Sequence, residues 1–522
     1  MKDVTYELLL PNPQEVVAGT NLSTLRKVIQ EIESTFETQV SPLFEDELIP
    51  EGNTELQNYY QITIPVADDK VWETAHQLQN IEDVINVDPD LPTRISIEPD
   101  IESSSSSSGG EEPEPDNKQW NKHITNFEQA LRYSREHGNR DGERLLRIGQ
   151  IDTGYTDHPE IRRIRKSEGF NFMNGSGNAR DPLTSGMGKQ PGHGTSVASV
   201  ILGENTSIPG DRTNGVLPNV LVVPYRIHDS VVLFRNDNLP RAALRALRRG
   251  CRVVTSSMGG VPKSSWHAAA RALYNAGSIW TSAAGNQVRV TVWPANYAEV
   301  VCCAAIGPSG NPWSGSSRGS AVEISAPGHQ VWVARTTQNS SGGESYSYGS
   351  GSGTSYATPH IAAVAALWVA HHGTALRRYT HPWQLVEAFR HCLRRSANNR
   401  GGSWDTRNFG AGVLDALALL RCPLPAPAAL THADYVPPGE FTTFNRPVTV
   451  AEKEVLYYAF NNDSGHLTGL KDFIMQKASP STKRHLESVL GSIDKIESFI
   501  QQDTDPYDDM QVFDDYVISL AQ

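Results

Sequence analysis

The chain has 522 residues, of which 38% are hydrophobic and 20% are charged, a composition typical of folded globular proteins. Its formal net charge is -13, with 46 basic against 59 acidic residues, and no basic stripe is present, which argues against a nucleic-acid partner. No run of about eighteen apolar residues occurs, so the sequence predicts no membrane-spanning helix and no membrane partner.

The first residues, Met1 to Glu7, carry early acidic side chains and no long apolar run, which argues against a signal peptide. The five cysteines show no CxxC spacing, and the adjacent pair Cys302 and Cys303 lies in an apolar stretch that is typical of a buried strand. We therefore expect buried, reduced thiols and a cytoplasmic protein, or a secreted one if a signal was removed before this numbering begins.

Residues 1–98 are predicted to form a small α+β domain. Strands are expected at residues 4–10, 59–64 and 84–87, and helices at residues 21–36 and 69–78. A β-α-β-β-α-β order favours a ferredoxin-like fold.

Two linkers divide the rest of the chain. In the first, residues 99–118, an unbroken serine run is followed by Gly, Glu and Pro, a composition that cannot bury a core and that favours a flexible, protease-accessible segment. The second, residues 423–440, is rich in proline. They separate a large domain, residues 119–422, from an acidic helical C-terminal domain, residues 441–522.

The large domain alternates strands with helices. Strands are expected at residues 145–151, 220–225, 252–255, 278–282 and 299–306, with a helix at residues 240–250. This alternation predicts an α/β fold with a mostly parallel sheet and helices on both faces. In such a fold, functional groups gather at the carboxyl ends of the strands.

The C-terminal domain is predicted to be helical. Residues 449–452 follow a capping-box pattern, and apolar residues between 486 and 500 recur at helical spacing, which is more typical of a core than of a partner groove. The acidic tail after residue 501 is expected to be solvated.

Four motifs in the large domain carry reactive side chains. Asp152 follows a buried strand, His193 precedes an apolar helix, and Asn286 ends a strand. Ser355 lies in residues 353–360, just before a long apolar run, and is therefore expected at a helix N-terminus. A helix N-terminus favours negative charge beside the serine and opposes protonation of the histidine. Each motif alone is an ordinary turn, loop or helix cap, but chance explains all four together poorly.

Acyl transfer assigns a role to each of these residues. Ser355 would attack a carbonyl, His193 would take the serine proton, and Asp152 would orient and stabilise the imidazolium. Asn286, with the backbone N–H of Ser355, would hold the oxyanion.

On these motifs, residues 120–420 resemble the subtilisin-like serine proteases. The matching segments are Ile151–Gly154, Gly192–Thr195 and Gly353–His360, with weaker echoes at Ala326–Gly328 and Phe409–Val413. The resemblance implies a serine endopeptidase that acts on protein or peptide substrates through an acyl-enzyme and needs no cofactor for its chemistry. The family often binds calcium, but its ligands cannot be matched to positions here, so a structural calcium site stays unassigned.

The resemblance also implies a substrate-binding edge. It consists of residues that pair with extended substrate and border the pocket for the residue before the cut: Ser257, Met258, Gly259, Gly260, Ala283, Ala284 and Gly285. Because these residues are small and uncharged, an apolar preference is expected. One departure is Tyr356, where the family usually has methionine.

Residues 1–98 resemble subtilase propeptides, which implies an intramolecular inhibitor and folding template that is removed by cleavage in or before the serine run. An unrelated α/β interaction domain is the alternative for this region. For the whole chain, the alternative is a regulated interaction protein whose helical C-terminal domain binds a protein partner that controls a latent protease.

Overall fold

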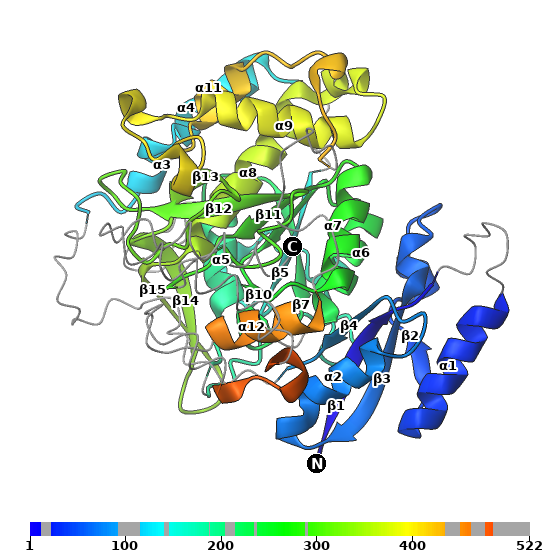
Figure 1. The fold of residues 1–522 in the computed structure, drawn as a ribbon. Helices are drawn as coiled ribbons and strands as arrows, with labels where there is room; N and C mark the ends of the chain where they lie inside the picture. The colour runs from blue at the N-terminus through cyan, green and yellow to red at the C-terminus, as the bar shows by residue number, and fades with distance from the viewer. Residues whose placement is uncertain are drawn as a thin grey trace, which may run out of the picture.

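A seven-stranded sheet forms the centre of the molecule (Figure 1). The computed structural model describes residues 1–11, 22–91, 115–139, 146–186, 188–203, 215–233, 237–287, 291–433, 449–460 and 476–483. Neighbouring strands of the sheet pair in parallel in the order β13-β12-β11-β9-β5-β7-β6. These strands are β5 (Arg147–Asp152), β6 (Phe170–Asn171), β7 (Leu221–Arg226), β9 (Val253–Ser256), β11 (Ile279–Ala283), β12 (Val300–Ile306) and β13 (Val322–Pro327).

The central strands are buried on both faces, as is usual for parallel sheets covered by helices. Every residue of β11 and β12 is buried, which explains why these segments read as continuous apolar or small-residue runs without alternation. The expected strands are therefore confirmed, with bounds that move by one or two residues.

Helices cover both faces of the sheet, as predicted. On one face α8 (Thr354–His372) contacts β9, β11 and β12, and α5 (His193–Leu202) packs beside it. On the other face α6 (Asn238–Arg248) packs on β5 and β9, and α7 (Ser264–Asn275) packs on β11. The remaining elements of this domain are α3 (Trp120–Ile124), α4 (Phe127–His137), β8 (Val232–Leu233), β10 (Gly259–Gly260), β14 (Val331–Gln338), β15 (Glu344–Gly351), α9 (Trp383–Ser396), α10 (Thr406–Phe409) and α11 (Ala416–Arg421).

The N-terminal unit, residues 1–91, has its own four-stranded antiparallel sheet in the order β2-β3-β1-β4. Its elements are β1 (Lys2–Leu9), α1 (Leu22–Phe36), β2 (Val40–Pro42), β3 (Tyr59–Val66), α2 (Val71–Gln79) and β4 (Asn86–Pro89). With the helices after β1 and β3, this is the ferredoxin-like arrangement that the sequence predicts.

The N-terminal unit packs against α6 and α7 of the large domain (Figure 1). One cluster of buried apolar side chains runs from β1 and β3 into these two helices. A polar contact crosses the same boundary, since the Tyr59 hydroxyl donates to the carbonyl of Ser264 over 3.1 Å. The two units therefore share a continuous interface.

The C-terminal helix α12 (Val450–Phe460) begins where the capping pattern predicts and packs on α2 and β4 of the N-terminal unit. The predicted serine run, the second linker from residue 434 to its end and the apolar stripe of residues 486–500 lie outside the described residues, as does the acidic tail. The domain boundaries stay predictions.

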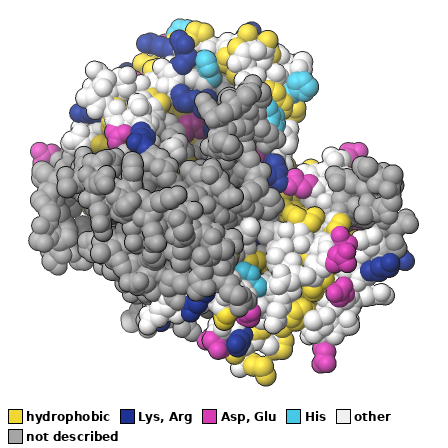
Figure 2. All heavy atoms as spheres, in the orientation of Figure 1, with side chains coloured by type: hydrophobic (Ala, Val, Ile, Leu, Met, Phe, Trp, Pro, Cys, Tyr) yellow, Lys and Arg dark blue, Asp and Glu magenta, His cyan; other side chains and the backbone are white. Residues whose placement is uncertain are grey.

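The thiols, the helix hydrophobicity and the surface charge of the described residues can be compared with what the composition predicts. The five cysteines are free and buried, as expected. None of the helices in the described ranges is long and apolar enough to cross a membrane. On the described part of the face in Figure 2, Lys and Arg side chains occur in small separate groups, with Asp and Glu among them.

Candidate active site

Asp152 and His193 meet at the carboxyl edge of the central sheet. Asp152 is the last residue of β5 and His193 is the first residue of α5, and both are almost fully buried. His193 Nδ1 lies 2.6 Å from Asp152 Oδ1, which also accepts the backbone N–H of Thr153 at 2.7 Å. The carboxylate therefore fixes the imidazole as the tautomer with hydrogen on Nδ1 and leaves Nε2 as the basic atom.

The backbone at the start of α5 lies very close to the backbone that follows β5, and this lets His193 reach Asp152. A Cβ atom on Gly194 would lie 2.1 Å from the carbonyl oxygen of Gly154 and 3.2 Å from the Cβ of Asp152. Only glycine at position 194 lets the start of α5 come this near to the end of β5. The small residues around His193 in the sequence thus have a packing reason.

Asp181 holds the two halves of this site together, and the sequence analysis did not single it out. Its buried carboxylate accepts from the Thr153 hydroxyl, from Gly192 N and from Leu183 N, each at 2.8 Å. Burial raises the pKa of Asp181 above its usual value. No motif or spacing marks this residue, since it lies in an irregular segment 28 residues from Thr153.

Ser355 is the second residue of α8, the helix that packs beside α5, of which His193 is the first residue. The ring of Tyr356, the next residue, lies 6.4 Å from the His193 ring between centroids. Ser257 Oγ donates to the carbonyl of Ser355 over 2.9 Å, which ties the first turn of α8 to the segment before β10. The serine backbone N–H thus belongs to a helix N-terminus, where N–H groups and the helix dipole favour an anion.

Asn286 lies against the same helix start. Its Oδ1 accepts from Thr354 N at 2.8 Å and from Thr354 Oγ1 at 2.9 Å, and Gly285 N donates to Thr354 Oγ1 at 3.1 Å. The structure therefore brings the four predicted reactive residues to one end of the sheet.

The residues of the expected substrate-binding edge lie in two adjacent segments, Ser257–Gly260 and Ala283–Gly285. Residues 292 and 293, which the sequence analysis missed, join the two: Val292 N donates to Ala284 O at 2.9 Å and Gly260 N donates to Trp293 O at 2.8 Å. The Val292 side chain lies so close to Gly259 that a Cβ there would meet Cγ2 at 2.5 Å.

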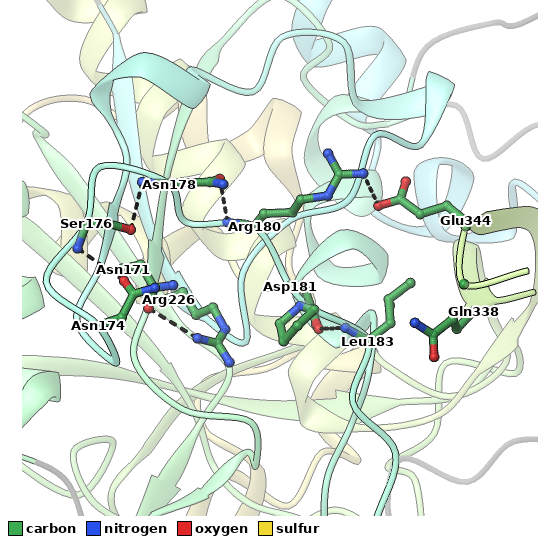
Figure 3. Close-up of a pocket in the computed structure, with 13 residues that line it drawn as sticks. Asn171, Asn174, Ser176, Asn178, Arg180, Asp181, Leu183, Arg226, Gln338 and Glu344 are labelled. Carbon is green, nitrogen blue, oxygen red and sulfur yellow. Dashed lines mark hydrogen bonds and ion pairs between the residues drawn. The ribbon is translucent and has the colours of Figure 1, made fainter.

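A polar pocket of about 420 Å³ opens beside the site (Figure 3). Asp181 lines it, and so does Arg226, which pairs in register with Asp152 on the neighbouring strand. Its two arginines, Arg180 and Arg226, are matched in number by the two carboxylates that line it, Asp181 and Glu344. The pocket wall is therefore close to electrically neutral.

No group of three or more His, Cys, Asp or Glu side chains that could hold a metal ion occurs within the described ranges. No calcium site can be assigned from these residues.

A parallel α/β sheet with a carboxylate–imidazole pair and a helix-opening serine at its carboxyl edge defines a subtilisin-like protein. The model of the subtilase family, Peptidase_S8, matches residues 145–412, about half of the chain. The chain belongs to the subtilase family.

Known proteins agree with this assignment. The thermostable alkaline protease of Halalkalibacterium halodurans is 33% identical over 228 residues, which are 42% of this chain and 56% of that protein. Thermitase of Thermoactinomyces vulgaris is 30% identical over 227 residues, 42% of this chain and 74% of thermitase. The chain spans little more than half the length of the first of these relatives.

Among solved structures, fervidolysin from Fervidobacterium pennivorans, described as a keratinolytic enzyme related to subtilisin, aligns with a TM-score of 0.54 and 19% identity. The alignment covers 81% of this chain and 62% of fervidolysin, so the shared fold extends beyond residues 145–412.

Proposed function

We propose that this chain is a serine endopeptidase in which Asp152, His193 and Ser355 act as a catalytic triad. The observation that carries the proposal is the 2.6 Å contact between His193 Nδ1 and Asp152 Oδ1, both buried, next to the helix that Ser355 opens. This pairing keeps Nε2 of His193 available to take the proton of the serine hydroxyl.

The reaction follows from these positions. Ser355 Oγ attacks the scissile carbonyl while His193 accepts its proton, and the imidazolium is stabilised by Asp152. The oxyanion is held by Asn286 and the backbone N–H of Ser355. His193 then protonates the leaving amine. In the second half of the reaction His193 takes a proton from water, the water attacks the acyl-enzyme carbonyl, and the proton returns to Ser355 Oγ as the leaving group. No step requires a metal or an organic cofactor.

The substrate would lie extended along Ser257–Gly260, with the side chain before the cut bordered by Ala283–Gly285. These walls carry no charge, which favours an uncharged substrate side chain. Protein or peptide is the proposed substrate class.

The N-terminal unit is proposed to act as an intramolecular inhibitor. It packs on α6 and α7, and β4 ends at Pro89, shortly before the predicted linker at residues 99–118. Cleavage in that linker would convert a zymogen into a complex of two separate chains.

Intact mass and fluorophosphonate labelling of the wild type and Ser355→Ala, expressed in parallel, test the proposal. We expect the wild type to lose about a hundred N-terminal residues and to take up label at Ser355, whereas the variant stays full-length and unlabelled. A wild type that is never labelled, even after its N-terminal unit has been removed, would overturn the proposed activity.

A further inference from the structure

Three carboxylates of the N-terminal unit gather where β1 and β4 run side by side. Glu7 faces Asp88 in the strand register, and Asp90 follows β4. Glu7 and Asp88 are each only 1% exposed. Three negative charges this close and this buried require cations to offset their repulsion and their lost hydration.

The large domain supplies one cation and a helix N-terminus. Lys263 Nζ donates to Glu7 Oε1 at 2.7 Å and also to Asp90. The Asp88 carboxylate accepts from Ser264 N at 3.1 Å and from Ser264 Oγ at 2.5 Å, and so caps the start of α7. These contacts leave the cluster with three acids and one lysine.

The second cation comes from the far end of the chain. Lys453 of α12 is 2% exposed, and its Nζ forms an ion pair with Asp88. The same Nζ donates to Asn86 Oδ1 at 3.0 Å and to Val87 O at 3.1 Å. These three oxygen partners offset the cost of burying the ammonium group, which without them would be strongly unfavourable. The contact between α12 and the N-terminal unit is therefore specific.

Further contacts surround this lysine. The Tyr457 ring lies 5.8 Å from the Trp72 ring between centroids, and Val450 and Tyr457 belong to the apolar cluster that runs through the N-terminal unit into α6 and α7. Helix α12 therefore adds both charge and apolar area to the N-terminal unit.

Residues 476–483 extend the same contact surface along α2. Thr482 Oγ1 lies 2.9 Å from His76 Nε2, and Ser481 Oγ donates to Glu73 at 3.1 Å. The Glu454 carboxylate of α12 accepts from Ser479 N and Oγ at 2.6 and 2.7 Å, so α12 and residues 476–483 are joined to each other. We call these two pieces the C-terminal clasp.

The clasp is covalently continuous with the large domain. Helix α11 (Ala416–Arg421), which precedes it in the chain, packs on α4 and α9 at the other end of the molecule (Figure 1). The N-terminal unit thus contacts two parts of one polypeptide, α6 and α7 on one side and the clasp on another. Binding at two linked surfaces slows dissociation, because both must open together.

From these contacts we propose that the C-terminal clasp is a second binding surface for the N-terminal unit and retains it on the large domain after the linker is cut. The inference rests on the proposed inhibitory role of the N-terminal unit. On this proposal, linker cleavage by itself leaves the N-terminal unit bound, and its release, which frees the large domain, requires the clasp to detach.

A binding experiment tests the clasp without using catalysis. In the full chain carrying Ser355→Ala, a recognition site for an external protease is inserted in the serine run at residues 103–108, and the protein is cut and passed over a gel-filtration column. We expect the cut protein to keep its N-terminal fragment. With Lys453→Met, release of the fragment is expected to be about tenfold faster or more, because a buried carboxylate loses its cation.

Lys477→Met is the matched control, since Lys477 is an exposed lysine of the same clasp. It should retain the fragment like the parent protein. Tyr457→Ala removes packing instead of charge and should also speed release. Because the two variants weaken the same surface by different means, a folding defect in one of them would not explain faster release in both. Equal retention in all four proteins would overturn the clasp.

An activity readout separates this inference from the proposed function. In chains with Ser355 intact, Lys453→Met and Tyr457→Ala should take up fluorophosphonate sooner after linker cleavage than the wild type and Lys477→Met. If no chain is ever labelled while release still depends on Lys453, the protease proposal fails and the clasp stands. If all chains are labelled at one rate and retain the fragment equally, the clasp fails and the protease proposal stands.

Discussion

Asn286 and Thr354 are joined by two hydrogen bonds, in which Asn286 Oδ1 accepts from the backbone N–H of Thr354 at 2.8 Å and from its hydroxyl at 2.9 Å. Because a backbone N–H can only donate, the amide atom that faces Thr354 must be the oxygen. The planar amide therefore presents its Nδ2 donor on the opposite side. Since Thr354 directly precedes Ser355, this contact sets the direction of the proposed oxyanion donor relative to the serine.

Replacing Asn286 by Ala should lower kcat by about 100–1000-fold with little change in KM, because the donor acts on charge that develops only in the transition state. That magnitude is taken from a subtilisin, a member of the same family. Steady-state kinetics on a chromogenic peptide measure both constants. Thr354→Ser, which keeps both donors to Asn286, serves as the control and should stay near wild type. A loss that appears in KM alone would contradict the oxyanion role.

Asp152→Asn should reduce kcat by about four orders of magnitude, the size found for the corresponding change in another serine-protease triad. The amide can donate to His193 Nδ1, which would shift the imidazole proton to Nε2 and remove the base. Pre-steady-state labelling with a fluorophosphonate reports the reactivity of Ser355 directly. Asp157→Asn changes an exposed acid five residues away, ion-paired with Arg180 and Lys166, and should keep nearly full reactivity.

Local sequence pointed to the four proposed reactive residues because each lies at or shortly after the end of a strand, or at the start of a helix, within its own short motif. Asp152, for example, follows a run that is buried in the structure over all but its first residue. Asp181 could not be predicted, because two of its three partners, Thr153 and Gly192, come from other segments of the chain and no local motif brings them to it. The ion pair between Lys453 and Asp88 could not be predicted either. It depends on how α12 packs on the N-terminal unit, and the spacing of residues along the sequence does not reveal that packing.

Tyr356 should make the active site resistant to peroxide. Its ring is 2% exposed and lies beside His193, at a position where methionine is usual in this family. Methionine at that position would be converted to a polar sulfoxide next to the imidazole. We expect Tyr356→Met to lose most of its fluorophosphonate labelling after peroxide treatment, with a mass gain of one oxygen, while the wild type keeps its labelling. Met258→Leu in the wild-type background tests whether the buried Met258 contributes to any residual loss.

His360 should make the stability of the fold depend on pH. This residue lies in α8 and is fully buried, and its Nδ1 lies 2.8 Å from the carbonyl of Tyr356 while its Nε2 lies 2.9 Å from Asn121 Nδ2. Nδ1 must donate to the carbonyl and Nε2 can accept from the amide, so the neutral ring satisfies both contacts. Burial, assisted by the charge of Lys122, lowers the pKa of His360 from 6.5 to about 4.

Because the folded-state pKa lies below the unfolded one, the unfolded chain binds the extra proton between pH 6.5 and pH 4, and the free energy of unfolding falls as pH falls through that window. His360 alone should account for a loss on the order of 2 kcal/mol between pH 8 and pH 5. Urea unfolding followed by tryptophan fluorescence, in the Ser355→Ala background to prevent self-digestion, measures this quantity. His360→Gln should be less stable at pH 8 but should lose less stability on acidification, whereas His381→Gln, at an exposed position, should keep the full slope. Parallel pH profiles for the parent protein and His360→Gln would show that other groups govern the acid sensitivity.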